Sequence, residues 1–519
     1  MPKLNFLYTA PLLAFGLLFG YNKIFITKLF QTFDLWTALG ILAVLWLLIL
    51  FVMFLLCGRR TAKPLLIGII LLNSVCLYFM DTYHISIDKV MLLNVLKTDA
   101  AEAADILKGG FWTYLILGGI VPAVLISKLK FTFPFASQRL LWLVCSLVLA
   151  ALIIVPNGKT AASVLRNHKK LKYDLLPVNY IGAMISVGKR LSAQNHEFVT
   201  IGNDATLKET AKNGKKNLLI LVVGETARDA NFSLSGYKRD TNAPLKPYLN
   251  EMYYFAKTQS CGTATAVSLP CMFSKDARTD FETSSESYTE NLLDILQKTG
   301  YRVIWRDNNS GCQGNCARIK TETFCDIYAC DDSVLLKNFA QTINEKYENT
   351  AIVLHQQGSH GPAYYKRFPK DKAVFKPYCQ KDDLKECSTE EIVNAYDNSI
   401  YYSSLMLADT INALKPFEKD YNIALLYVSD HGESLGEKGL YLHSAPYRFA
   451  PDEQTLVPMF WWIPDKSAAA KRLDRPCLRK QTLKHWSHDS VFHTILGLSD
   501  VKTSEYKKAL DLMSACRQN

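Results

Sequence analysis

Long apolar segments fill the N-terminal third of the chain and constrain its fold more than any other feature. Five apolar stretches lie before residue 156, at residues 7–21, 35–57, 65–79, 111–126 and 140–155. A helix of about 20 apolar residues crosses a bilayer, because its backbone groups pair internally and its side chains contact lipid. The first and third stretches are short, and a cleaved signal peptide is the alternative for the first, although it lacks a convincing cleavage site. We expect five membrane spans.

Basic residues in two loops predict how these spans are oriented. The loops after the second and fourth stretches carry Arg59, Arg60 and Lys63, and Lys128, Lys130 and Arg139. Loops rich in Lys and Arg stay in the cytoplasm. An odd number of spans then places everything after Pro156 outside the inner membrane. We therefore expect a transmembrane domain at residues 1–156, a juxtamembrane interfacial helix and linker at 157–216, and a periplasmic domain at 217–519.

The formal net charge of +11 does not indicate a protein that binds nucleic acid. Much of the excess lies in the cytoplasmic loops and in residues 159–190, where basic residues precede the apolar stretch 180–185. These basic residues are Arg166, Lys169, Lys170 and Lys172. A basic stretch beside an apolar one predicts a helix lying on an anionic membrane surface. An ordinary solvated linker is the alternative, and we expect no nucleic-acid partner.

A carboxylate and an imidazole stand side by side at Asp430 and His431, directly after the apolar run 423–428. Both side chains are good zinc ligands, and the loop after a strand can direct them to one point. Glu225 follows a second apolar run, 218–224, of the kind found in parallel sheets covered on both faces. The alternatives are an exposed turn for the Asp-His pair and a helix start that favours Glu for Glu225. Together the three residues predict a metal site.

Residues 260–271 place small hydroxyl residues between two cysteines. A threonine hydroxyl becomes a nucleophile when zinc binds it, and a helix N-terminus behind it would stabilise an incoming phosphoryl group. Thr265 is the nucleophile candidate and Thr263 its competitor, and a cap held by a structural disulfide is the alternative. His360 and His443 follow further presumed strand ends, where open α/β sheets gather their ligands.

Five motifs in fixed order carry a resemblance to a known family. They are GETAR (224–228), SCGTATAVSLPCMFS (260–274), RDNNSG (306–311), GSHGPAYYKR (358–367) and YVSDHGESLGEKGLYLH (427–443). They resemble the bacterial phosphoethanolamine transferases that modify lipid A, a family that includes the mobile colistin resistance enzymes. The similarity runs along essentially the whole chain. It implies an α/β fold class: a five-helix N-terminal transmembrane domain followed by an alkaline phosphatase/sulfatase-like α/β/α sandwich domain.

The resemblance also implies an activity, namely zinc-dependent transfer of phosphoethanolamine from phosphatidylethanolamine to a lipid A phosphate. Zinc would be bound by Glu225, Thr265, Asp430 and His431, and Thr265 would carry the covalent intermediate. His360 and His443 would contact phosphate, hold a second zinc or act as acid and base.

The added ammonium would reduce binding of cationic peptides such as polymyxin. The partners would be phosphatidylethanolamine, lipid A and the anionic membrane surface, and the enzyme would act as a monomer with residues 217–519 as its periplasmic catalytic domain. The alternatives are a core sugar or another periplasmic glycan as acceptor, or a phosphoglycerol transferase of the lipoteichoic acid synthase type. A sulfatase is disfavoured because the residues after Thr265 do not form a C/S-x-P-x-R motif.

Seven further residues are candidates for substrate binding: Asn94, Thr98, Glu102, Asp280, Asn309, Ser310 and Gln313. The first three recur every four residues and would line one face of a helix. In the family, matching residues line the site for the ethanolamine amine, and a solvated helix face is the alternative. Relatives often have a phosphate-contacting lysine where this chain has Gln313. That contact must therefore be weaker or come from another group, such as Lys275 or Arg306.

The 13 cysteines agree with an exported domain. Three of them, Cys57, Cys76 and Cys145, lie in membrane spans, which leaves ten in the exported part, where oxidation would form disulfides. A cytosolic zinc cluster is the alternative for the four between 312 and 330. Pairing cannot be read from the sequence. We favour Cys261 with Cys271 and Cys379 with Cys387, then Cys312 with Cys316, Cys325 with Cys330, and Cys477 with Cys516.

Overall fold

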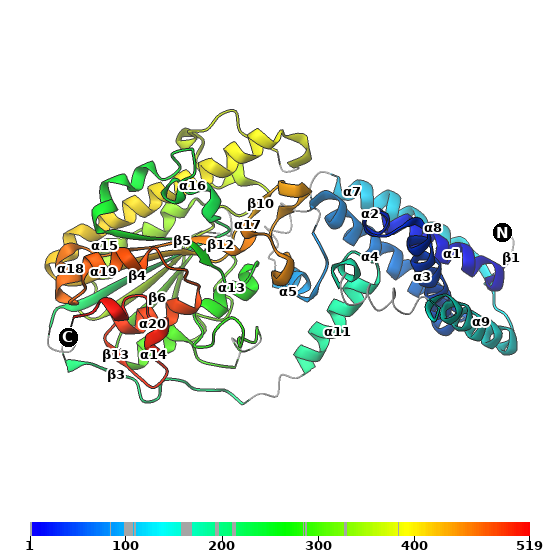
Figure 1. Ribbon diagram of the computed structural model, residues 1–519, viewed down its shortest axis with the longest axis horizontal. Coiled ribbons are helices and arrows are strands. Elements are labelled where there is room, and N and C mark those ends of the chain that lie inside the picture. The colour runs from blue at the N-terminus through cyan, green and yellow to red at the C-terminus, as the bar shows by residue number, and fades with distance from the viewer. Residues whose placement is uncertain are drawn as a thin grey trace. The chain divides into compact units, whose positions relative to one another are not determined.

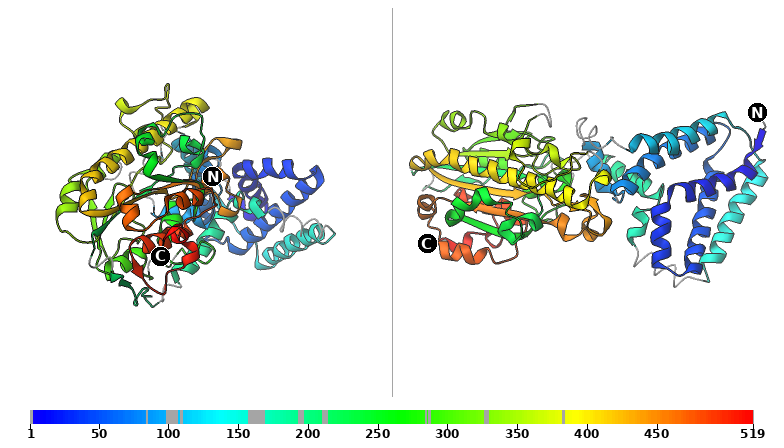
Figure 2. Two further views of the ribbon diagram at one scale, coloured as in Figure 1. Left: turned by 60° about the vertical axis from the view of Figure 1, so that its left-hand side comes forward. Right: turned by 90° about the horizontal axis from the view of Figure 1, so that it is seen from above.

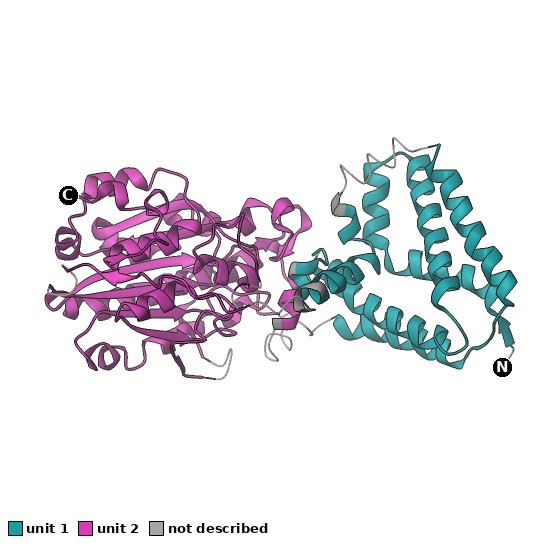
Figure 3. Cartoon of the chain, turned by 90° about the horizontal axis from the view of Figure 1, so that it is seen from below, with its two compact units in different colours: residues 1–92, 107–188 teal, residues 93–106, 189–519 magenta. Residues whose placement is uncertain are grey.

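A computed structural model describes the chain at residues 3–83, 85–97, 107, 110–156, 169–192, 197–209, 214–283, 285, 288–325, 330–381 and 384–518 (Figure 1, Figure 2). It divides into two compact units, coloured separately in Figure 3. Unit 1 comprises residues 1–92 and 107–188, and unit 2 comprises residues 93–106 and 189–519. The predicted division at residues 156 and 216 stays a prediction.

Unit 1 is built from the apolar stretches of the sequence, each of which forms a helix. The helices are α1 (Phe6–Tyr21), α2 (Lys23–Thr32), α3 (Leu35–Leu56), α4 (Ala62–Tyr83), a span made of α7 (Phe111–Thr113), η1 (Tyr114–Ile120) and α8 (Val121–Lys128), and α9 (Ala136–Ile154). Four helices of the described part are long and apolar enough to cross a membrane. A fifth span is reached if α1 and α2, which are bent by 77°, are counted as one. Five spans are therefore the upper end of what the helices allow.

Three further elements complete the described part of unit 1 and its border. A short strand β1 (Lys3–Asn5) pairs in parallel with β2 (Lys130–Thr132), and α5 (Lys89–Lys97) follows α4. The segment after α9 forms η2 (Lys169–Tyr173) and α11 (Val178–Ser192). On α11, Tyr180, Ala183 and Val187 are buried at helical spacing, whereas Ile181 and Ile185 are exposed. An exposed apolar face of this kind suits contact with lipid, and the interfacial position of this helix stays a prediction.

The central element of unit 2 is a seven-stranded sheet, whose strand order is β5-β12-β9-β4-β8-β6-β7. Its strands are β4 (Lys216–Gly224), β5 (Met252–Gln259), β6 (Arg302–Asp307), β7 (Lys320–Thr323), β8 (Thr350–His355), β9 (Tyr421–Ser429) and β12 (Leu456–Trp462). β12 pairs antiparallel with both β5 and β9, and the pairs β4–β8, β4–β9, β6–β7 and β6–β8 are parallel. The two long apolar runs of the sequence are therefore β4 and β9, which lie next to each other at the centre.

Helices cover both faces of this sheet (Figure 2). Leu219, Leu221 and Val223 of β4 enter one core, with α13 (Thr265–Met272), α14 (Leu292–Lys298), α18 (Asp465–Ala470), α19 (Arg475–Gln481) and α20 (Asp489–Leu498). The alternate residues Leu218, Ile220 and Val222 enter the other, with α15 (Phe339–Asn344) and α16 (Thr389–Leu414). Because alternate strand residues point to opposite faces, a strand covered on both sides must be apolar throughout. Unit 2 is thus the α/β/α sandwich that the sequence predicted.

The remaining small elements surround the ends of the sheet. They are β3 (Thr206–Leu207) paired with β13 (Val501–Lys502), β10 (Ser434–Leu435) paired with β11 (Tyr441–Leu442), and α17 (Asp452–Thr455). The loops that carry the site residues follow the carboxyl ends of β4, β6, β8 and β9.

Candidate active site

The ends of two neighbouring parallel strands bring three predicted metal ligands together. Gly224 of β4 is in register with Ser429 of β9, so the next residues, Glu225 and Asp430, start adjacent loops. One ligand atom each of Glu225, Asp430 and His431 lies within 4.8 Å of the others, and all three side chains are fully buried. Such a group of two carboxylates and one imidazole is a donor set that suits zinc.

Hydrogen bonds fix the orientation of these ligands. Nδ1 of His431 lies 2.9 Å from the Gly432 carbonyl oxygen, so this nitrogen carries the proton and Nε2 faces the carboxylates with its lone pair. Oδ1 of Asp430 accepts from the backbone N–H of Thr226 at 3.1 Å and of His431 at 2.7 Å. Its Oδ2 is buried and has no hydrogen-bond donor in the described part of the chain. A buried carboxylate oxygen without a donor is unfavourable unless a cation binds it, so these residues fit a metal ion.

The charges of the cluster shift one another's pKa values. Burial raises the pKa of Glu225, but the hydrogen bond and charge of His431 outweigh burial and hold that pKa well below its usual range. Burial and the neighbouring Glu225 raise the pKa of Asp430. For His431, burial lowers the pKa, and the two carboxylates more than reverse this effect. The site therefore attracts a cation, which can be a proton or a metal ion.

The structure distinguishes the two candidate nucleophiles. Thr265 is the first residue of α13, and its Oγ1 lies 3.2 and 3.1 Å from the two carboxylate oxygens of Glu225 and 3.3 Å from Nε2 of His431. It is half-buried, whereas the three ligands are fully buried. Thr263 is buried, and its hydroxyl donates to the Ala445 carbonyl oxygen at 2.6 Å. Thr265 is therefore the hydroxyl that contacts the carboxylate and imidazole cluster and is also partly exposed.

Asn309 and Ser310 follow the end of β6. Nδ2 of Asn309 donates to Oε2 of Glu225 at 3.0 Å and to the Gln356 carbonyl at 2.8 Å, which places the Asn309 side chain at the metal cluster. The backbone N–H of Ser310 donates back to the Asn309 side chain at 2.6 Å. Nδ1 of His355 lies 2.7 Å from Oδ1 of Asp307, and its Nε2 lies 3.4 Å from Nδ2 of Asn309. The hydrogen bond from Asn309 therefore helps to fix the orientation of the Glu225 carboxylate.

His360 and His443 lie together beside the cluster. The ring centroids of His360 and His443 are 5.4 Å apart, and those of His431 and His443 are 4.4 Å apart. Burial and the adjacent His431 lower the pKa of His443. Sequence reasoning missed Glu433, whose Oε2 lies 2.8 Å from Nδ1 of His443. Glu433 stands two residues after the Asp-His pair in the sequence, so its position in the same loop could have indicated it.

Of the other candidates, one is exposed, one lies in a turn, one contacts a residue next to His443, and two lie outside the described residues. Asp280 is exposed, and Gln313 adopts a positive φ of 49° in a turn. Nδ2 of Asn94, which belongs to unit 2, donates to Oγ of Ser444 at 2.9 Å, next to His443. Thr98 and Glu102 lie outside the described residues.

The two cations considered as replacements for the lysine, Arg306 and Lys275, pair with other parts of the fold. Arg306 is 1% exposed, donates to the carbonyls of Leu335 and Lys337 at 2.8 and 3.0 Å, and pairs with Glu322 at 3.0 Å. Lys275 pairs with Glu505 at 3.1 Å. Both cations are therefore paired with carboxylates of the same domain.

The ten cysteines of unit 2 form five disulfides in the structure, in the pairs that the sequence analysis favoured. They are Cys261–Cys271, Cys312–Cys316, Cys325–Cys330, Cys379–Cys387 and Cys477–Cys516. The first encloses Thr265, and Cys57, Cys76 and Cys145 are free thiols in unit 1. Disulfides confined to one unit agree with export of that unit.

The fold and the site define a phosphoesterase-like α/β enzyme domain that is attached to membrane-spanning helices. Comparison with known proteins supports both parts. A family model described as "Phosphoethanolamine transferase EptA/EptB" matches residues 45–191, and one described as "Sulfatase" matches residues 217–501.

Two curated relatives and one solved structure match most or all of the chain. Phosphoethanolamine transferase EptA of Escherichia coli (strain K12) is 38% identical over 472 residues, which cover 88% of this chain and 86% of that protein. Phosphatidylethanolamine transferase Mcr-1 of Escherichia coli is 33% identical over 515 residues, which cover 94% and 93%. The structure of the integral membrane protein lipooligosaccharide phosphoethanolamine transferase A (EptA) from Neisseria meningitidis matches with a TM-score of 0.95 and 32% identity, covering 100% of both chains.

The chain therefore belongs to the EptA family of phosphoethanolamine transferases. It is a transferase enzyme of the inner membrane, and its sulfatase-like domain lies in the periplasm.

Proposed function

We propose that the enzyme moves phosphoethanolamine from phosphatidylethanolamine to a phosphate group of lipid A, through a covalent adduct on Thr265. The observation that carries this proposal is the position of Thr265: its hydroxyl is the half-buried member of an otherwise buried cluster with Glu225 and His431. The relatives supply the transferred group, since they are named for phosphoethanolamine or phosphatidylethanolamine transfer.

Glu225, Thr265, Asp430 and His431 would hold one zinc ion, for which the buried Oδ2 of Asp430 is available. Zinc in this position would lower the pKa of the threonine hydroxyl and offset the negative charge of the phosphate. We propose one ion because Glu225, Asp430 and His431 form one group of potential metal ligands in the described residues. A second ion near His360 and His443 is the alternative to a role of these imidazoles in proton transfer.

In the first step, Oγ1 of Thr265 forms a bond to the phosphorus of phosphatidylethanolamine, and the bond from phosphorus to the diacylglycerol oxygen breaks. The carboxylate of Glu225, 3.1 Å from Oγ1, lies within reach of the threonine proton. The departing diacylglycerol oxygen takes a proton from a histidine, for which His360 and His443 are the candidates. Because Thr265 starts α13, the partial positive charge of the helix N-terminus favours the anionic phosphoryl group.

In the second step, a phosphate oxygen of lipid A attacks the same phosphorus. The bond from phosphorus to Oγ1 of Thr265 breaks, and the hydroxyl regains its proton. The product carries an ammonium beside a lipid A phosphate, so polymyxin and other cationic peptides bind the surface less strongly.

The amine of the donor would be bound by Asn94, Thr98 and Glu102. The contact of Asn94 with Ser444, next to His443, supports this assignment for the first of the three. Neutral donors such as Asn309 and Ser310 would then replace the missing lysine in contacting phosphate, because Arg306 and Lys275 have partners within the fold.

Peptide mapping of the full chain tests the proposal. After incubation with phosphatidylethanolamine, the protein should carry a phosphoethanolamine adduct on Thr265. Thr265→Ala should fold and carry none, while Thr263→Ser, which keeps a hydroxyl for the bond to Ala445, should behave like the wild type. Mass spectrometry of lipid A from cells with and without the gene tests the acceptor. An adduct on Thr263, or unmodified lipid A alongside a modified core sugar, would contradict the corresponding part of the proposal.

A further inference from the structure

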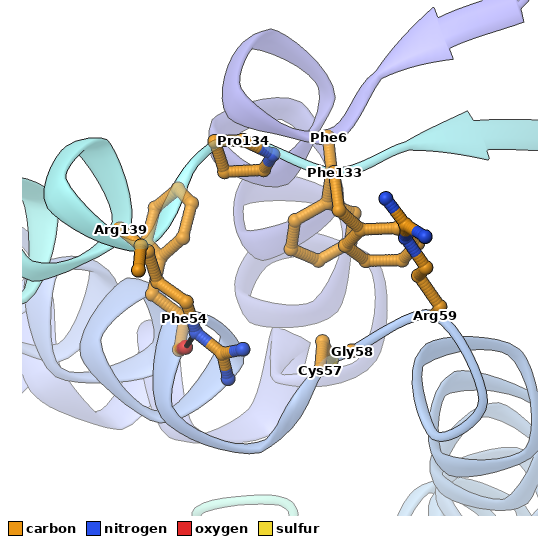
Figure 4. Close-up of a pocket in the computed structure, with 9 residues that line it drawn as sticks. Phe6, Phe54, Cys57, Gly58, Arg59, Phe133, Pro134 and Arg139 are labelled. Carbon is orange, nitrogen blue, oxygen red and sulfur yellow. Dashed lines mark hydrogen bonds between the residues drawn. The ribbon is translucent and has the colours of Figure 1, made fainter.

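A pocket lies in unit 1, far along the sequence from the residues of the active site (Figure 4). Its volume is about 240 Å³, and it lies where the C-terminal end of α3, the start of α1 and the start of α9 come together. Since the chain leaves the membrane for the periplasm after α9, the start of α9 is at the cytoplasmic side. The active site does not use this pocket.

Two guanidinium groups line the pocket. Figure 4 shows Arg59 and Arg139 entering it from different sides. Nη2 of Arg139 donates to the Leu55 carbonyl at 2.7 Å, and its Nε donates to the Phe54 carbonyl, so this side chain is fixed on the end of α3. Arg59 makes no hydrogen bond or ion pair with the parts of the chain that the structure describes.

Aromatic rings form a fixed wall beside these cations. Phe6 stacks on Phe133 with centroids 5.1 Å apart and meets Phe54 edge to face at 6.0 Å. Phe54 in turn stacks on Trp142 at 5.7 Å. A wall built from rings on four segments keeps its shape, so the pocket is preformed.

The segments around the pocket contain no carboxylate that could neutralise it. Residues 1–33, 35–80 and 106–173 contain neither Asp nor Glu. Besides the two arginines, Lys3 and Lys130 stand directly opposite each other in the β1–β2 pair, and like charges in that position repel. An anion from outside the chain would pair with the guanidinium of Arg59 in these basic surroundings.

The surroundings favour a lipid as the source of that anion. Leu55 and Leu56, at the end of α3, and Leu140 and Leu141, next to Arg139, are each at least half exposed and apolar. A ligand with a phosphate for the arginines and acyl chains for these leucines satisfies both surfaces. Basic pockets between membrane helices on the cytoplasmic side bind acidic phospholipid head groups in this way.

We propose that this pocket binds the phosphate of an anionic phospholipid from the cytoplasmic leaflet. The guanidinium of Arg59 contacts the phosphate, Arg139 and the N-terminal turn of α9 add positive charge, and the aromatic wall packs against the glycerol part of the head group. This site is separate from the periplasmic one, and its occupant is not consumed.

Native mass spectrometry of the full chain tests this site. Protein from nanodiscs containing phosphatidylcholine with a minor fraction of phosphatidylglycerol should retain phosphatidylglycerol selectively. Arg59→Gln should lower this retention about ten-fold, because a charge-assisted contact in a pocket contributes more than general surface attraction. Arg60→Gln is the matched control: Arg60 is also exposed, carries the same charge and does not line the pocket. It should retain the lipid as the wild type does.

Three results would overturn the proposal. Arg59→Gln could retain phosphatidylglycerol like the wild type, or Arg60→Gln could lose it equally, which would indicate surface attraction alone. Inorganic phosphate could displace the lipid from the wild type and stabilise the protein as strongly in pure phosphatidylcholine nanodiscs, which would identify a soluble anion as the ligand. A thermal unfolding scan of each variant confirms that it is folded.

Discussion

Nδ1 of His443 lies 2.8 Å from Oε2 of the buried carboxylate of Glu433. The other carboxylate oxygen, Oε1, accepts a hydrogen bond from the Tyr364 hydroxyl at 2.7 Å. The carboxylate therefore fixes the ring of His443 and makes Nδ1 the protonated nitrogen, so that Nε2 is the nitrogen that can take up a proton and pass it on.

Glu433→Gln should lower turnover at least ten-fold, because the amide no longer fixes the tautomer of His443. The measurement is the initial rate of phosphoethanolamine transfer as a function of pH, with zinc content determined in parallel. The acidic limb of the rate profile should shift, while the zinc content stays unchanged. An unaltered profile would show that Glu433 has a structural role only.

Asp430→Asn should remove most of the bound metal. An amide replaces the buried carboxylate, so both the charge and the oxygen that has no donor among the described residues are lost. Elemental analysis of full-length protein should find about one zinc per wild-type chain and little in the variant. The exposed Asp452 serves as the control, since Asp452→Asn should keep its zinc. Active wild-type protein without zinc would contradict the assignment.

Gly358→Ala should destabilise the fold by about 3 kcal/mol or more. Gly358 has a φ of +53°, and a Cβ there would lie 2.5 Å from the carbonyl oxygen of Glu225 and 2.8 Å from its nitrogen. The control is Gly300→Ala: its φ is +85°, but a Cβ would meet nothing within 4 Å, so only about 1 kcal/mol of backbone strain is expected. Equal losses in thermal unfolding would show that the close approach to Glu225 does not matter.

His488 should make the protein sensitive to acid. Burial lowers the pKa of His488 to about 3 from its ordinary value of 6.5, and its Nδ1 accepts from the Cys261 N–H at 3.2 Å. The unfolded chain binds this proton below about pH 6.5 and the folded chain only near pH 3, so stability falls as pH decreases through that window. Near pH 5 the loss is about 2 kcal/mol relative to neutral pH.

The measurement for this prediction is the unfolding temperature at several pH values. His488→Asn should flatten its pH dependence, even if the variant is less stable throughout. His485→Asn, at an exposed histidine, should leave the slope unchanged. An unaltered slope in His488→Asn would assign the acid sensitivity to other groups.

Removal of the disulfide that encloses Thr265 should affect activity more than removal of another of similar size. Cys261–Cys271 and Cys379–Cys387 span 10 and 8 residues, so their loops lose similar entropy and both deletions should cost about 2 to 4 kcal/mol. Only the first would loosen the nucleophile. Double Cys→Ser variants with equal transfer rates at low temperature would contradict this.

The clustering of Glu225 with Asp430 and His431 could be anticipated from the sequence because Glu225 and Asp430 each follow an apolar run. The carboxyl ends of parallel strands meet at one edge, and no knowledge of strand order was needed to expect the two residues close together. The position of Thr265 could not be derived in the same way, since it depends on how α13 packs beside strands that precede and follow it by many residues. The resemblance to a known family supplied that link.

Three further features of the fold could not be predicted from the sequence, because they depend on contacts between distant segments. The 77° bend between α1 and α2 lies at Asn22, just after the apolar stretch 7–21, and no local pattern sets its angle. The antiparallel direction of β12 is set by its pairing with β5 and β9. Arg306 looked available for phosphate because a sequence does not show that the carbonyls of Leu335 and Lys337 accept its hydrogen bonds.

The oxygen of Asp430 that lacks a donor among the described residues would also link metal supply to the amount of protein. If the cluster binds zinc as proposed, chains without zinc would keep two carboxylates buried side by side and would open more often as a result. Periplasmic proteases act on opened chains, so zinc limitation would shorten the lifetime of the enzyme in addition to stopping its turnover. Cells short of zinc would then lose this surface modification gradually, as old protein is degraded and new protein fails to mature.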